Sequence, residues 1–138
     1  MISELNEHFG LGESLRFGAH SSGLVQGIVS TPLCSATFFL HGAHLAHWQP
    51  ATQKSPVLFM SMNSDFVPNK PIRGGVPVCF PWFSSHPKDP SQPGHGWART
   101  REWSVLETAI IDGTVYVRVG LEQHPFFLSY ELHFSDEL

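Results

Sequence analysis

Short apolar segments separated by turn-forming residues run along most of the chain. Within each segment β-branched, aromatic and small residues predominate, and Pro, Gly and Asp-Gly punctuate the segments, as is typical of strands. The segments that predict strands are 23–30, 36–48, 57–61, 103–111, 114–121 and 126–134. Because no amphipathic helical pattern separates them, the strands are expected to pair antiparallel in an all-β sandwich.

Two local signals refine this picture. Asp112-Gly113 stands between two alternating apolar runs, which favours a type I′ turn and a hairpin. Leu5, Phe9 and Leu11 suggest a short helix in the first dozen residues, although Gly10 and Gly12 interrupt the pattern.

The segment 71–96 differs from the rest of the chain. It contains six Pro and four Gly, together with Phe80, Trp82, Phe83 and His86. Such a composition prevents a regular strand or helix, so we expect a long irregular loop along a concave face. Long ordered loops commonly carry function.

Length and composition fit one globular domain spanning 1–138, since 41% of the 138 residues are hydrophobic. The net charge of −4 gives no overall attraction to nucleic acids or anionic membranes. Five of the eight Lys and Arg residues nevertheless lie between 70 and 101, where Asp89 is the sole acidic residue. The sequence therefore predicts a small anionic ligand in this region.

Cysteine content and hydropathy bear on location. Cys34 and Cys79 are too few and too far apart for a disulfide framework, and both are expected to be buried free thiols. We find no signal-peptide pattern and no apolar run long enough to span a membrane, so a cytoplasmic location is expected.

Two arginines are candidate ligand-binding residues. Arg73 precedes Gly74 and Gly75, a combination that lets backbone approach a ligand while the guanidinium binds oxyanions. An exposed arginine in an ordinary turn explains the same pattern equally well. Arg99 follows His95, and an imidazole and a guanidinium around Trp97 could line a polar pocket.

Other residue types give weaker candidates. His41, His44 and His47 suggest a metal site, but in an extended strand His44 would face away from the other two, so a structural role is favoured. No serine or cysteine has the surroundings of a nucleophile. Trp82 and Trp97 could stack on a sugar ring.

Four ordered motifs resemble those of the hexose-6-phosphate mutarotase (glucose-6-phosphate 1-epimerase) family, within the aldose-epimerase superfamily. They are 40–50 (LHGAHLAHWQP), 56–61 (PVLFMS), 71–83 (PIRGGVPVCFPWF) and 95–103 (HGWARTREW). The similarity covers the N-terminal half of such a protein. It implies part of a galactose-mutarotase-like supersandwich, no cofactor, and a hexose 6-phosphate as substrate.

The resemblance also implies residue roles. In that family the arginines matching Arg73 and Arg99 bind substrate, and the histidine matching His95 contacts a sugar oxygen. Some members carry a glutamine immediately before this histidine, where this chain has Gly94. The reaction interconverts α and β anomers by ring opening, using an acid histidine and a base glutamate.

Both catalytic residues are expected beyond Leu138, and we do not transfer their roles to Glu131 or His133. The fragment alone is therefore expected to be inactive. A non-catalytic carbohydrate-binding module is the main alternative, and a metal-dependent cupin-like barrel is a third. A sandwich cut midway would leave strand edges unpaired, so a homodimer through those edges is expected.

Overall fold

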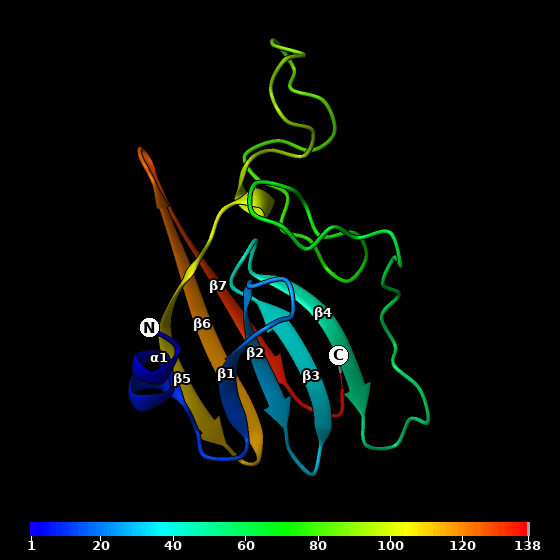
Figure 1. The fold of residues 1–138 in the computed structure, drawn as a ribbon, viewed down its shortest axis with the longest axis vertical. Coiled ribbons are helices and arrows are strands. Elements are labelled where there is room, and N and C mark those ends of the chain that lie inside the picture. Colours follow the sequence, from blue (N-terminus) through cyan, green and yellow to red (C-terminus); the bar gives the residue numbers. More distant parts are fainter. Residues whose placement is uncertain (138) are drawn as a thin grey trace.

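Two antiparallel sheets pack face to face in this computed structural model, which describes residues 1–137 (Figure 1). One sheet has the order β1 (Leu15–Ala19), β2 (Val25–Ser30), β3 (Cys34–Phe39) and β4 (His44–Pro50). The other has the order β5 (Ser104–Ile111), β6 (Thr114–Gln123) and β7 (Phe126–Phe134). The all-β antiparallel sandwich expected from the sequence is confirmed.

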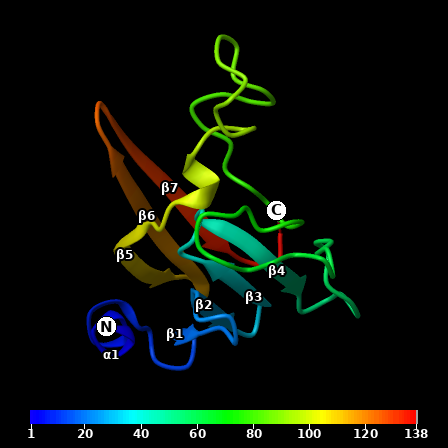
Figure 2. The ribbon, with the colours of Figure 1, turned by 45° about the horizontal axis from the view of Figure 1, so that its top comes forward.

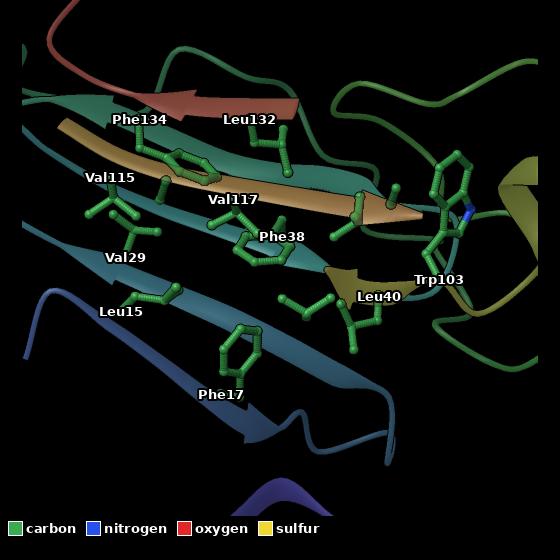
Figure 3. Close-up of a cluster of buried hydrophobic side chains, with 14 of the residues drawn as sticks. Leu15, Phe17, Val29, Phe38, Leu40, Trp103, Val115, Val117, Leu132 and Phe134 are labelled. Atoms are coloured by element: carbon green, nitrogen blue, oxygen red, sulfur yellow. The ribbon is translucent and has the colours of Figure 1, made fainter. Parts of the chain in front are cut away.

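The core lies between the two sheets, where inward-facing side chains alternate with exposed ones along each strand (Figure 3). Phe38 of β3 is at its centre, fully buried, with its ring stacked on Phe134 at 5.7 Å and edge-on to Phe17 at 6.2 Å. Gly27 of the neighbouring strand leaves room for this ring, because a β-carbon there would overlap it. Aromatic contacts therefore join both sheets at one point.

A short helix, α1 (Ile2–Phe9), covers the flank formed by the edge strands β1 and β5 (Figure 1). The Asn6 amide donates to the carbonyl of Phe17 and accepts from its N–H, both at 2.8 Å. Thr108 of β5 donates its hydroxyl to the carbonyl of Phe9 at 2.8 Å. The helix expected in the first dozen residues is confirmed.

The strand predictions hold for β2 and for the C-terminal sheet, and the others need correction. The predicted strand 36–48 is two strands, because Gly42 and Ala43 both have positive φ and turn the chain. The segment 57–61 is not a strand, since its regular pairing is limited to the bridge between Met60 and Gly74. The strand β1 was not predicted.

The Asp112-Gly113 turn has positive φ at both residues, 51° and 80°, and joins β5 to β6 as expected of type I′.

Between β4 and β5 the chain is irregular except for one 3₁₀ turn, η1 (Ala98–Thr100). This stretch is longer than predicted, and its green-to-yellow part extends beyond the strand ends (Figure 1). Within the part of the chain described, no helix is long and apolar enough to cross a membrane.

Candidate functional site

Arg73 and Arg99 line one open pocket, with a volume of about 270 Å³, beside the start of β4. The remaining lining residues are Ile72, Gly74, Gly75 and Pro77. In Figure 2 the yellow turn η1, which carries Arg99, lies next to the green segment that follows β4. The pocket brings together the two arginines expected to share a site, and its lining contains no carboxylate.

The backbone around Arg73 is fixed on both sides. Its N–H donates to the Ser64 hydroxyl at 3.1 Å, and its carbonyl accepts from the N–H of Ser61 at 3.0 Å. Gly75 donates to the carbonyl of Phe59 at 2.7 Å. The Arg73 side chain itself is exposed, so a hydrogen-bonded backbone presents its guanidinium to the pocket.

The Arg99 side chain is held more tightly than that of Arg73. Its Nη2 donates to the carbonyl of Gly94 at 2.8 Å, whereas its buried Nε has no acceptor among the described residues. Burial lowers the pKa of Arg99, and the nearby charge of Arg73 acts in the same direction. An anion placed beside the exposed Arg73 and the partly desolvated Arg99 would be stabilised by both positive charges.

Two buried histidines support the segment that carries Arg73. His41 donates its Nε2–H to the carbonyl of Lys70 and His44 donates its Nε2–H to that of Gly74, each at 2.6 Å. Burial lowers the pKa of His44, the hydrogen bond to Gly74 opposes this shift, and the charge of Arg99 adds to it. Both histidines therefore hold loop backbone, which fits the structural role favoured from the sequence, although their carbonyl partners were not predicted.

The expected alternation of the three histidines fails because His41 lies in the β3–β4 turn and not in an extended strand. His47 contacts the Ser35 hydroxyl at 3.2 Å, away from the other two. Among residues 1–137 no group of three His, Cys, Asp or Glu side chains is arranged to hold a metal ion.

His95 is not among the residues lining the arginine pocket. Its Nδ1 accepts a hydrogen bond from the N–H of Ser84 at 3.0 Å, and its ring meets Phe83 edge-on at 4.7 Å. It follows Gly94, the residue whose carbonyl binds Arg99. His95 is therefore the neighbour in sequence of Gly94, which Arg99 contacts. Its own ring contacts Ser84 and Phe83 and does not line the pocket.

The loop tryptophans make contacts within the protein. Trp97 packs edge-on against Phe80 at 5.7 Å and lies near Phe126 at 6.4 Å. Trp82 donates its indole N–H to the carbonyl of Pro93 at 2.9 Å. Neither lines the arginine pocket.

Glu131 and His133 lie elsewhere, on the exposed side of β7, where His133 Nε2 is 3.1 Å from a Glu131 oxygen. With Glu107, Tyr116 and Arg118 they line a separate pocket of about 160 Å³ that shares no residue with the arginine pocket. The ionisable side chains lining the arginine pocket are the two guanidiniums. This pocket can bind an anion, but its own lining supplies no acid or base suited to neutral pH.

Comparison with known proteins places this pocket in a family context. A protein of Escherichia coli (strain K12) named "Putative glucose-6-phosphate 1-epimerase" is 44% identical over 78 residues, which cover 56% of this chain and 26% of that protein. A protein of the same name from Haemophilus influenzae is 41% identical over 64 residues, covering 46% of this chain and 22% of its own length.

A solved structure matches this chain over more of its length than the two sequence relatives do. The crystal structure of "a putative mutarotase (YeaD)" from Salmonella typhimurium superposes with a TM-score of 0.84 at 29% identity, covering 92% of this chain and 45% of that one. The chain thus spans less than half the length of this solved relative. The family model for aldose 1-epimerase matches residues 28–135, which include both arginines and all strands except β1 and the start of β2. The chain therefore belongs to the aldose 1-epimerase family.

Proposed function

We propose that this chain is the sugar-phosphate-binding part of an isomerase that interconverts the α and β anomers of a hexose 6-phosphate. The observation that carries the proposal is the convergence of Arg73 and Arg99 on one pocket without a lining carboxylate. Adjacent guanidiniums suit an oxyanion, and the glycines beside Arg73 let backbone approach it. The names of the relatives, which specify glucose 6-phosphate, support the same substrate class.

Anomer exchange requires one group to protonate the ring oxygen and another to remove the proton of the anomeric hydroxyl. Each transfer contributes about 100- to 10,000-fold to the rate. Because the pocket lining contains neither group, we assign the acid histidine and the base glutamate to the part of the relatives that this chain does not cover. The chain on its own then binds the substrate weakly and leaves anomerisation at the buffer rate.

His95 has a defined part in this proposal. Its Nδ1 accepts from Ser84, so in the neutral imidazole the proton resides on Nε2. An Nε2–H group can donate to a sugar hydroxyl or ring oxygen. We therefore propose that the Nε2–H of His95, which follows the Gly94 carbonyl bound by Arg99, contacts the sugar while the arginines bind the phosphate.

The first test measures substrate binding. Glucose 6-phosphate is titrated into the ¹⁵N-labelled chain, with Arg99→Gln as the variant and Arg101→Gln as the control. Arg101 is exposed and does not line the pocket, so both substitutions remove one charge from the same short segment. We expect roughly tenfold or greater loss of affinity for Arg99→Gln alone, as fits a charge-assisted hydrogen bond. Equal affinities would refute the assignment.

The competing function is a non-catalytic carbohydrate-binding module, which the absence of an acid or base from the pocket lining favours. Exchange spectroscopy of glucose 6-phosphate, with the chain alone and with a matching C-terminal half, distinguishes the two. Faster anomer exchange on adding that half indicates the isomerase. Unchanged exchange in a complex that binds sugar indicates the module.

We also propose that residues 1–138 fold as one domain in the cytoplasm. A single core formed by both sheets supports one domain, and two free cysteines suit a reducing compartment.

A second copy of the chain is the partner proposed for β7. This strand is a sheet edge of nine residues without Pro or Lys, the residues that commonly protect edges. Antiparallel pairing of two β7 strands about Tyr130 would place Ser129 opposite Glu131 and Phe127 opposite His133. Like charges are then not directly opposed.

A further inference from the structure

We propose that His44 is a positioning residue, whose Nε2–H bond to the carbonyl of Gly74 holds Arg73 opposite Arg99. The inference rests on the proposed function, because it explains how the anion pocket keeps its shape. It concerns a side chain that does not itself line the pocket.

The contact joins the rigid sheet to the middle of the pocket segment. His44 is the first residue of β4 and is 1% exposed, and Gly74 lies between two lining residues, Arg73 and Gly75. The next strand residue, Leu45, accepts from the N–H of Val76 at 2.9 Å. Two consecutive residues of β4 therefore hold the backbone on either side of Gly75.

The polarity of the bond fixes the state of the imidazole. A carbonyl oxygen can only accept, so His44 Nε2 carries a proton, and in the neutral ring Nδ1 carries none. Burial lowers the pKa of His44 and outweighs the opposing effect of the hydrogen bond to Gly74, so the neutral donor is the favoured form. A neutral donor suits this position, since a lysine or arginine would add another positive charge beside the two that bind the anion.

His41 strengthens the arrangement from the same turn. Its Nε2–H bond to the carbonyl of Lys70 fixes the start of the segment, and His44 fixes Gly74. Arg73 lies between these two attachment points. Its guanidinium therefore starts from a backbone whose position is set by the β3–β4 turn.

The test compares His44→Gln, which keeps a neutral N–H donor, with His44→Leu, which has none. His47→Leu is the matched control, because His47 lies on the same strand and contacts Ser35 instead of the pocket segment. The measured quantities are the dissociation constant for glucose 6-phosphate and the amide shifts of Gly74 and Gly75. We expect His44→Leu to lose about tenfold or more in affinity, consistent with a lost hydrogen bond plus a displaced segment. His44→Gln should recover most of it, and His47→Leu should match the wild type.

A folded His44→Leu protein with wild-type affinity would overturn the proposal. If that variant does not fold, the ¹⁵N spectrum of histidine in the wild type decides. A proton on Nε2 of His44, coupled to the Gly74 carbonyl, supports the proposal, whereas the Nδ1–H form overturns it. Failure of the binding function is separately visible, because Arg73→Gln and Arg99→Gln would then leave affinity unchanged.

Discussion

Gly75 lies directly against the carbonyl oxygen of Leu45, so closely that a β-carbon on Gly75 would overlap that oxygen. The adjacent bridge between Leu45 and Val76 holds the two segments in contact. Gly75 also has a φ of 59°, in the left-handed region. Both space and backbone conformation therefore require glycine at this pocket residue.

Replacing Gly75 with alanine should destabilise the protein more than replacing Gly12, which has the same φ of 59° but open space around it. Gly12→Ala should cost about 1–2 kcal/mol for the left-handed conformation alone. Gly75→Ala should cost about 1–3 kcal/mol more, because the backbone must move. Urea unfolding of both variants measures the difference. Equal losses would mean that the pocket segment is not pressed against β4.

The closure of the β1–β5 flank by α1 predicts a clear effect at Asn6. Asn6→Asp keeps an acceptor for the N–H of Phe17 but removes the donor to its carbonyl, and should lower the free energy of unfolding by about 1–3 kcal/mol. Ser3→Ala, an exposed position on the same helix, should change it by less than about 0.5 kcal/mol. Chemical denaturation that gave both variants the same stability would argue against helix docking through Asn6.

The lowered pKa of His44 predicts a dependence of stability on pH. Below the ordinary histidine pKa of about 6.5 the unfolded chain takes up a proton at this position before the folded chain does, so stability falls as pH decreases. This loss continues until the folded-state pKa is reached, and it is absent above about pH 7.5.

In His44→Gln this contribution disappears. The stability advantage of the wild type over His44→Gln should therefore shrink between pH 7.5 and pH 5.5, as measured by unfolding at matched ionic strength. An advantage that stays constant or grows on acidification would show that His44 is not held neutral in the folded state.

The proposed β7 dimer predicts that a negative and a positive charge at position 129 affect dimerisation differently. Ser129 is exposed and would face Glu131 of the other copy. Ser129→Glu should weaken dimerisation roughly threefold to tenfold through like-charge pairs, and Ser129→Lys should not. Sedimentation equilibrium measures both. A wild-type protein that remains monomeric at high concentration would contradict the proposed dimer.

Local sequence signals were sufficient to predict strand pairs where side-chain alternation and turn chemistry agree. The β5–β6 hairpin follows from alternating apolar residues around Asp112-Gly113, both of which have the positive φ that a type I′ turn needs. The β6–β7 pair follows from the same alternation, with Val117 and Leu132 on the inner face.

Elsewhere the deciding contacts join distant parts of the chain. The turn at Gly42 and Ala43 interrupts an apolar run that reads as one strand, and His41 and His44 find their partners in a loop some thirty residues later. Such carbonyl partners leave no pattern in the sequence. Cys79 was expected to be buried and is only half-buried, because its segment extends beyond the sheets.

The two pocket arginines were identified from their glycine and histidine neighbours, and the structure brings them together. Their surroundings were not foreseeable, because the contacts of Arg99 depend on how the loop turns back through Gly94. The binding roles of Arg73, His95 and Arg99 remain predictions.

The central claim is that Arg73 and Arg99 bind one phosphate together, and a double-mutant cycle tests it most directly. Calorimetric titration of glucose 6-phosphate is performed on the wild type, Arg73→Gln, Arg99→Gln and the double variant. If both side chains contact the same anion, each single variant loses affinity and the double variant loses less than the sum of the two free-energy changes, by about 0.5 kcal/mol or more. Strictly additive losses, or none, would contradict a shared phosphate site.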